Sequence, residues 1–252
     1  MRTRDALAGG ALAVAGSYWA LMSPYSQMLG RFPYRGPSTR RQVALTFDDG
    51  PNEPFTSRII EYLNQRAIKA TFFQVGQCVE RHPGLSVRMA ADGHVIGAHG
   101  YSHRLHRCFT RASIRSEVAM SQAILRAALG VEPLLFRPPW LIRPPALFDT
   151  LGESALRPVS GEFCHPLEVF QPSAERIARR TLAKIRPGSI IIFHDGFNAK
   201  AGDRSQTVEA VKLVVEELKA AGYSFTTVDR MLGVPAYRPV GTSGDAGQGA
   251  QT

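Results

Sequence analysis

The sequence predicts a single α/β domain built on a parallel β-sheet, either open and doubly wound or closed as a barrel. Short runs of β-branched and aliphatic residues alternate about seven times with longer segments whose apolar residues recur at helical spacing, which is typical of βαβ units. The 252-residue chain is long enough for one α/β domain of the upper size range. No internal repeat or interdomain linker is recognisable after residue 40, so one domain is expected from 41 to 235.

The strands are predicted from short apolar runs that end at turn residues or polar residues. Val43 to Phe47 is rich in β-branched and aliphatic side chains and runs directly into two aspartates and a Gly-Pro turn signal. Ser189 to Phe193, with three consecutive isoleucines, is the clearest strand of the chain. The remaining predicted strands are Ala70 to Val75, His94 to Ala98, Leu134 to Phe136, a weak strand near Arg157 to Ser160, and Ser224 to Val228.

The helices are predicted from apolar residues at i, i+3 and i+4 spacing and from capping residues at the helix ends. Thr110 can cap a long helix that runs to about Leu129 and stops at Gly130, and Ser173 can cap another. The other predicted helices are Thr56 to Ala67, Pro83 to Asp92, a helix around Pro145 to Leu151, and Thr207 to Ala221; the helix capped by Ser173 runs to Ile185.

The two ends of the chain predict segments outside this domain. Met1 to Arg4 is basic, and Ala6 to Met22 is apolar and uncharged, as in a signal peptide or a short membrane anchor. Residues 1–40 are therefore assigned to this segment and a linker, and the domain is expected to be exported; a cleaved signal and a retained membrane anchor are both left open. Residues 236–252 end in a stretch of Gly, Ser, Gln and Ala without periodicity, which predicts a disordered tail.

The overall charge and the cysteine pattern exclude several classes of function. The formal net charge is +9, but the arginines are scattered and no run resembles a nucleic-acid-binding module, so nucleic acid is not an expected partner. An anionic cell envelope explains the basic character better. Cys78, Cys108 and Cys164 contain no CxxC spacing and indicate neither a disulfide framework nor a cysteine zinc site. A single bridge between Cys108 and Cys164 is left open.

Polar side chains gather just beyond the carboxyl ends of separate predicted strands. In a parallel barrel these ends share one face, which is where active sites are built. Two adjacent carboxylates at the end of a buried strand repel each other and lose hydration, so they persist mostly where a cation or a proton-transfer role compensates them. An ordinary Asp-Gly turn is the alternative for these two residues alone. The residues at these strand ends are Asp48, Asp49, His99, His103, Arg137 and His194.

His99 and His103 are spaced i, i+4, which on a helical turn places both imidazoles on one side, as zinc ligands often are. Taken alone, such a pair is more often explained by two surface or core histidines. Combined with a carboxylate from a neighbouring strand end, it predicts a metal site of two histidines and one carboxylate. Such a site leaves a coordination position for water, which is the arrangement of catalytic rather than structural metal sites.

The segments TFDDGP, HGYSH, RPPW and IFHD, in this order and at these intervals, resemble the motifs of the polysaccharide deacetylase family, the NodB-homology domain of carbohydrate esterases. The resemblance covers residues 42 to 232, approximately, and the first motif together with ATFFQVG is its most specific part. It implies a fold, an irregular parallel (β/α) barrel of about seven strands. It also implies a divalent metal ion, most often zinc, held by Asp49, His99 and His103.

The same resemblance implies roles for four further residues. Asp48 would be the general base that takes a proton from water, and Arg137 would pair with this carboxylate and orient it. His194 would be the general acid that protonates the leaving amine. Trp140 would line the sugar groove, and its backbone N–H would stabilise the developing oxyanion. Without the resemblance, Arg137 would be interpreted as an exposed strand-end charge and His194 as a structural histidine.

The chain departs from the family pattern in three places. Gly100 stands where Ser or Thr is usual, and Leu141 stands where a glycine commonly follows the aromatic residue. The fourth motif, usually Asp-rich with a Trp, is not recognisable in the stretch that ends at Glu168. Another acid must then orient the general acid, and Glu168 is preferred by position over Glu162 and Asp195. The side chain of Asp195 is expected to point to the opposite side of its strand.

These assignments predict a metal-dependent hydrolase that removes acetyl groups from N-acetylated amino sugars of an envelope or extracellular polysaccharide or oligosaccharide. O-deacetylation of an acetylated glycan is the nearest variant. A non-catalytic glycan-binding protein on the same fold is one alternative, and the filled ligand and acid–base positions argue against it. An amidase for a small or lipid-linked substrate is the other, and the altered fourth motif keeps it open.

Overall fold

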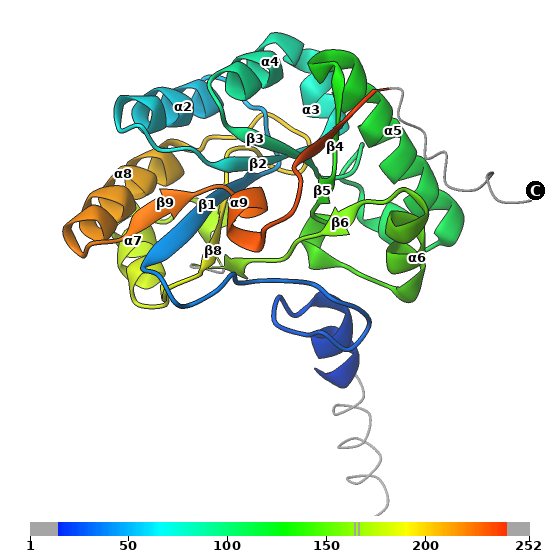
Figure 1. Ribbon diagram of the computed structural model, residues 1–252, viewed down its shortest axis with the longest axis horizontal. Coiled ribbons are helices and arrows are strands. Elements are labelled where there is room, and N and C mark those ends of the chain that lie inside the picture. The colour runs from blue at the N-terminus through cyan, green and yellow to red at the C-terminus, as the bar shows by residue number, and fades with distance from the viewer. Residues whose placement is uncertain (1–14, 164, 166, 241–252) are drawn as a thin grey trace, which may run out of the picture.

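The computed structural model describes residues 15–163, 165 and 167–240. Its main element is a curled eight-stranded sheet in which all paired strands are parallel. Seven strands follow the order β6-β5-β3-β2-β1-β8-β7, and β9 pairs with the start of β1 (Figure 1). The strands are β1 (Gln42–Asp48), β2 (Thr71–Gln74), β3 (Val95–Ala98), β5 (Leu135–Phe136), β6 (Arg157–Pro158), β7 (Glu162–Phe163), β8 (Ile190–His194) and β9 (Ser224–Thr226).

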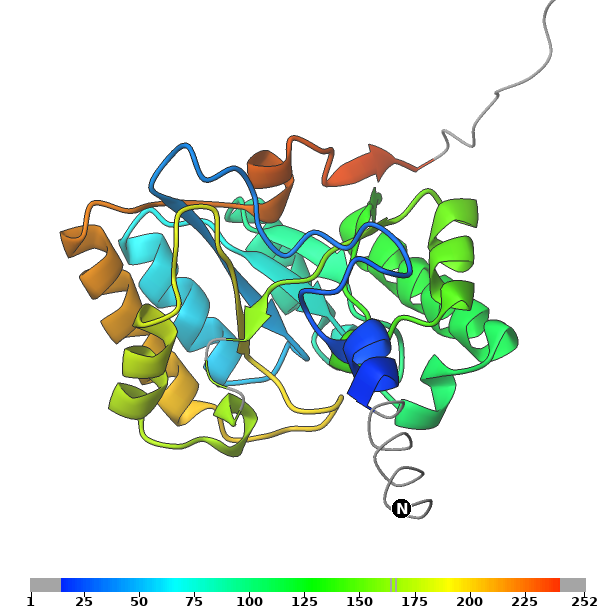
Figure 2. The ribbon, with the colours of Figure 1, turned by 90° about the horizontal axis from the view of Figure 1, so that it is seen from below.

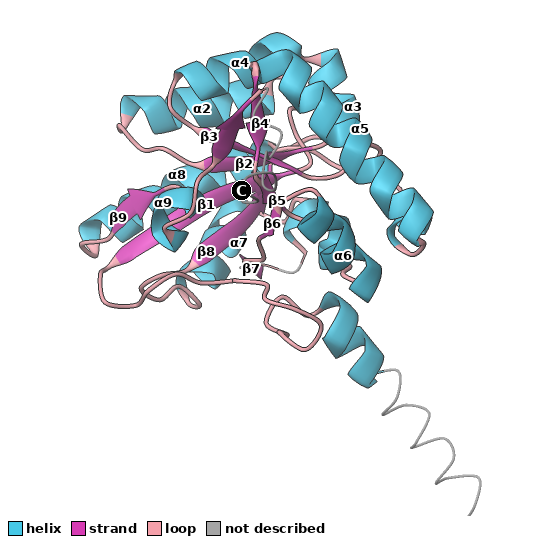
Figure 3. Cartoon of the chain, turned by 45° about the vertical axis from the view of Figure 1, so that its right-hand side comes forward, coloured by secondary structure: helices cyan, strands magenta, loops and turns pink. Residues whose placement is uncertain are grey.

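Helices pack around the outside of the curled sheet (Figure 3). Thr110 caps the longest of them by accepting a hydrogen bond from the backbone N–H of Ser113, and Gly130 ends it in the left-handed conformation. Ser173 caps a second helix in the same way. The helices are α2 (Phe55–Gln65), α3 (Gly76–Arg81), α4 (Pro83–Ala91), α5 (Arg111–Leu129), α6 (Pro145–Glu153), α7 (Ala174–Leu182), α8 (Ser205–Ala220) and α9 (Val228–Leu232).

Side chains of the central strand β1 alternate between two buried layers, because successive residues of a strand point to opposite faces. Val43, Leu45 and Phe47 pack into the large core that the sheet shares with the outer helices. Ala44 belongs instead to a smaller cluster that includes Phe73 of β2. Asp48 has the same parity as Ala44, so the alternation that builds the core also turns this carboxylate toward the inside of the curled sheet.

The predicted fold is confirmed as a single domain with a parallel, barrel-like sheet, and the differences are local. The helices α3 and α9 and the strands β4 (Val131–Pro133) and β7 were not predicted, because all four are short and carry no periodic signal. The predicted last strand ends at Thr226, before α9 begins at Val228. Tyr237–Pro239 were assigned to the tail but form strand β10, antiparallel to β4 (Figure 1). The hydroxyl of Tyr237 accepts a hydrogen bond from the backbone N–H of Ile96 at 2.7 Å, and this contact fixes the segment. Residues 241–252 lie outside the described residues.

The segment before β1 packs on the domain instead of standing away from it as a linker. Residues 15–22 are helical, and the chain then runs along the domain to β1 (Figure 2). Phe32 in this segment is fully buried. Within the described part of the chain, no helix has the length and hydrophobicity needed to span a bilayer. Most of the apolar segment Ala6 to Met22 precedes residue 15 and is outside the described residues.

Candidate active site

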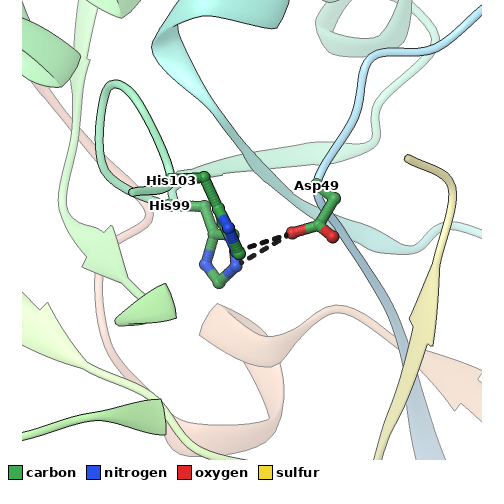
Figure 4. A group of neighbouring side chains, drawn as sticks. All are labelled: Asp49, His99 and His103. Atoms are coloured by element: carbon green, nitrogen blue, oxygen red, sulfur yellow. Dashed lines mark ion pairs between the residues drawn. The ribbon is translucent and has the colours of Figure 1, made fainter. Parts of the chain in front are cut away.

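Asp49, His99 and His103 converge at the carboxyl ends of β1 and β3, and all three are buried (Figure 4). The Oδ1 atom of Asp49 lies 3.4 Å from Nε2 of His99 and 3.0 Å from Nε2 of His103. The other carboxylate oxygen of Asp49 accepts a hydrogen bond from the backbone N–H of Asn198 at 3.0 Å. One oxygen is thereby anchored to the protein, and the other is turned toward both imidazoles.

This cluster fits a cation because a lone pair on a histidine nitrogen faces a lone pair on the oxygen of Asp49. The Nδ1 atom of His99 is 2.7 Å from the carbonyl oxygen of Arg137, which only accepts hydrogen bonds, so the proton of this imidazole is on Nδ1. The Nε2 atom then presents a lone pair to Asp49 Oδ1, a buried oxygen without a hydrogen-bond partner among the described residues. A carbonyl that fixes the tautomer and leaves the other nitrogen free is the usual support of a metal-ligating histidine.

The protonation of Asp49 is consistent with a ligand carboxylate. Burial alone would raise the pKa of Asp49, but the two imidazoles beside it, His103 above all, hold this pKa well below its usual range. The group therefore stays ionised in its buried position, as a metal ligand must.

The loop from His99 to His103 is not the helical turn that the i, i+4 spacing suggested. Gly100 and His103 have φ angles of 73° and 50°, so the backbone folds back on itself through the left-handed region. Gly100 meets this requirement without a side-chain penalty, whereas the usual Ser or Thr would not. Glu117 of α5 holds the loop: its carboxylate accepts hydrogen bonds from the N–H groups of Tyr101 at 3.0 Å and Ser102 at 2.7 Å.

Glu117 was not identified from the sequence. It also accepts a hydrogen bond from the hydroxyl of Ser102 at 2.7 Å, so one carboxylate satisfies three donors of the loop. The available signal was an acidic residue beside the buried positions Ile114 and Val118 of an amphipathic helix. That signal does not reveal which loop such an acid would contact.

Asp48 and Arg137 form a buried ion pair with a distance of 2.7 Å between Oδ1 and Nη1. The side chain of Arg137 is fully buried rather than exposed. Its guanidinium also donates to the hydroxyl of Thr46 and to the carbonyl of Ser160, each at 2.7 Å, and lies 4.1 Å from the centre of the Phe73 ring. Burial lowers the pKa of Arg137, and the charge of Asp48 opposes this effect. These contacts fix the position of the guanidinium group, with Nη1 on the Asp48 carboxylate.

His194 and Glu168 form the second charged pair of the site, with 2.6 Å between Nδ1 and Oε2. Burial lowers the pKa of His194, but the charge and hydrogen bond of Glu168 outweigh burial and raise it to about 9. Of the three acids considered, Glu168 is the one in contact with this imidazole. Glu162 instead pairs with Arg35, and Asp195 accepts a hydrogen bond from Thr56.

A cleft of about 340 Å³ opens over these groups and brings the predicted acid, base and metal ligands to one space. Trp140 lies on its wall, with its ring centroid 4.1 Å from that of His103. Trp140 and Leu141 both have positive φ angles, 51° and 57°, so the chain makes a tight left-handed turn there. The thiols of Cys78 and Cys108 are free, and Cys164 lies outside the described residues.

Several known proteins are similar to this chain in sequence and fold. A family model described as polysaccharide deacetylase matches residues 35–153. A peptidoglycan-N-acetylglucosamine deacetylase of Bacillus cereus is 32% identical over 204 residues, covering 81% of this chain and 93% of that protein. A chitooligosaccharide deacetylase of Bradyrhizobium sp. is 35% identical over 199 residues, covering 75% and 90%. The crystal structure of the Bc1960 peptidoglycan N-acetylglucosamine deacetylase matches with a TM-score of 0.75 at 30% identity, covering 81% of this chain and 94% of that one.

The parallel barrel carries a cleft lined by a carboxylate, Asp48, and an imidazole, His194, which is a combination that hydrolases use for acid–base catalysis. The chain belongs to the polysaccharide deacetylase family, as its four motifs predicted. It is accordingly an enzyme, a hydrolase of carbon–nitrogen bonds other than peptide bonds, rather than a binding protein on the same fold.

Proposed function

We propose that this protein is a metal-dependent N-deacetylase of an envelope or extracellular glycan that carries N-acetylated amino sugars. Membership of the family makes it a deacetylase of N-acetylated sugars. The metal dependence is supported by the lone pairs that Asp49 and His99 direct at each other when His99 is neutral, because a cation between them would make that contact favourable. Zinc is the metal we favour, because two imidazoles and one carboxylate are its usual catalytic ligands.

Asp49, His99 and His103 would hold the ion. A divalent ion there would supply Lewis-acid chemistry, lowering the pKa of water and polarising a carbonyl group. Asp48 takes the proton of the attacking water, and the buried guanidinium of Arg137 holds this carboxylate in place at the cleft. The backbone N–H of Trp140 donates to the acetyl oxygen as negative charge develops on it.

His194 completes the reaction by delivering a proton to the amine nitrogen as the C–N bond breaks. Its pair with Glu168 keeps the imidazole protonated up to about pH 9, since Glu168 raises the pKa of His194. The reaction needs His194 in its protonated form at the start of this step, and the glutamate beside it favours that form.

Export and a location at the cell envelope are part of the proposal. They are supported by the basic start and the apolar segment Ala6 to Met22 of the sequence and by the formal charge of +9, which suits an anionic envelope. A cleaved signal and a retained anchor would both place the domain outside the cytoplasmic membrane.

The proposal is tested by acetate release from purified full-length protein that has been stripped with a chelator and then reloaded with zinc. Chitooligosaccharides, peptidoglycan fragments and acetylated xylan form the substrate panel, so that N-acetyl and O-acetyl groups are compared directly. We expect release from N-acetylated sugars, loss of it in chelator, and recovery with about one metal ion per chain. Activity that is unaffected by complete metal removal would refute the metal dependence, and release from xylan alone would refute the substrate class.

A further inference from the structure

The N-terminal segment contacts the catalytic cleft from outside, although it precedes the family match. Residues 21–35, here called the N-terminal strap, comprise the last two residues of the N-terminal helix and the chain that leads from it toward β1 (Figure 2). Phe32 of the strap is fully buried and clusters with Leu141 and with Ile192 of β8. The strap therefore reaches the turn that carries Trp140.

Arg143 is the main link between this turn and the strap. Its side chain is 1% exposed and lies 4.7 Å from the centre of the Phe32 ring. The guanidinium donates to the carbonyl oxygens of Ser23 and of Ser26, the latter at 3.2 Å, and to that of Leu141 at 3.1 Å. One buried cation thus joins two strap carbonyls to the residue that follows Trp140.

Backbone contacts extend the same link. The N–H of Arg143 donates to the carbonyl of Leu21 at 3.1 Å. Ser160, which follows β6, donates through its hydroxyl to the carbonyl of Pro24 at 2.8 Å and through its N–H to that of Pro33 at 2.9 Å. The carbonyl of this same Ser160 accepts from Arg137, the partner of Asp48. The strap is therefore bonded to the supports of two catalytic groups.

The turn at Trp140 and Leu141 needs such support. Both residues have φ angles in the left-handed region, which bulky side chains seldom adopt, and surrounding contacts must hold them there. Phe32 packs against one of the two residues, and Arg143 binds its carbonyl oxygen.

We propose that the N-terminal strap is a positioning element of the catalytic site and that Arg143 is the positioning residue through which it holds the turn of Trp140. This inference rests on the proposed role of Trp140 in the deacetylation, and it adds the residues that place this group. An N–H that must meet an oxyanion within hydrogen-bond range tolerates little displacement, and a shift near 1 Å can cost about a hundredfold in rate.

The test uses full-length protein in a Trp19→Phe background, which leaves Trp140 as the sole tryptophan of a chain that has two. Arg143→Met removes the donors while keeping most of the apolar stem. Arg41→Met is the matched control, because Arg41 also donates to a backbone carbonyl, that of Ala221, beyond the opposite end of β1. Turnover, KM, metal content and quenching of Trp140 fluorescence by acrylamide are measured for each variant.

We expect Arg143→Met to lower kcat about tenfold to a hundredfold and to raise the acrylamide quenching constant of Trp140 at least twofold, with metal content unchanged. Arg41→Met should change neither kcat nor quenching. Phe32→Leu, a milder change on the strap side of the same contact, should move kcat and quenching in the same direction and decides the matter if Arg143→Met fails to fold.

A folded Arg143→Met or Phe32→Leu variant with kcat within twofold of the parent would overturn the proposal. So would a loss of kcat with unchanged quenching of Trp140, because the turn would then be held by something else. The fluorescence readout does not depend on activity. A parent protein that lacks deacetylase activity would therefore refute the proposed function, and the quenching of Trp140 would still test whether the strap holds the turn.

Discussion

Replacing Glu168 by Gln removes the charge that keeps His194 protonated while preserving the size of the side chain. Glu168 raises the pKa of His194 to about 9 from an ordinary 6.5, an interval worth roughly 3 kcal/mol in favour of the imidazolium. Without that charge, burial lowers the pKa of His194, and only the charges of Asp49 and Asp48 still oppose this effect. We therefore expect the protonated fraction of His194 at pH 8, and kcat with it, to fall about tenfold.

The pH profile separates this effect from a general loss of structure. The alkaline limb of kcat should move downward by about two pH units in the variant, and the two enzymes should approach each other below pH 6. A bound divalent cation lowers the pKa of His194 in both proteins, so the comparison between them is the measurement. Glu132→Gln is the control, since Glu132 pairs with Arg126 and Arg238 on the β4–β10 side of the fold.

The free energy of unfolding should also depend on pH through His194, and the raised pKa of this imidazole fixes the direction of that dependence. The folded pKa of His194 lies above its unfolded value, so the pair with Glu168 stabilises the fold fully below pH 6.5 and loses this contribution as pH rises through about 9. Urea unfolding of metal-free protein should show this decline in the parent and not in Glu168→Gln. A variant with unchanged kcat and an unchanged alkaline limb would show that His194 is oriented and charged by another group.

Three further predictions test the other parts of the site and the export of the chain. Asp48→Asn should abolish acetate release while metal analysis still gives about one ion per chain, whereas His103→Ala should lose both; an empty site in Asp48→Asn would contradict the assignment of the base. Glu117→Gln should weaken metal affinity about tenfold to a hundredfold, measured by competition with a chelator, because it loosens the loop that carries the second histidine; unchanged affinity would show that the loop holds itself. A reporter fused after Ser38 should be found outside the cytoplasmic membrane, and a soluble cytosolic reporter would exclude export.

The strands and the convergence of their polar ends could be predicted because both depend on local pattern. A buried parallel strand is a short apolar run, and parallel strands place their carboxyl ends on one face whatever their order in the sheet. Asp48 and His194, which are direct neighbours across β1 and β8 in the structure, could therefore be assigned to one face before their pairing was known.

The features that could not be predicted depend on contacts between distant parts of the chain. The i, i+4 spacing of His99 and His103 fits a helical turn, yet the chain uses a loop with two left-handed residues that Glu117 stabilises from α5. Three acids were available near His194, and position alone favoured Glu168. The structure shows where the competitors are used: Glu162 contacts Arg35, a residue of the segment that the sequence suggested was only a linker.

The strap also determines which recombinant fragments of the chain would keep the site intact. The family match begins at residue 35, and a recombinant fragment starting there would contain every predicted metal ligand, the base and the acid. It would lack the carbonyls of Ser23 and Ser26 and leave the buried guanidinium of Arg143 without them, at a cost of about 1–3 kcal/mol for each lost charged contact. Such a fragment would fold less stably and present Trp140 in a loosened turn. A boundary drawn from sequence similarity would therefore pass through the catalytic unit, and the shortest fragment that preserves it begins before Leu21.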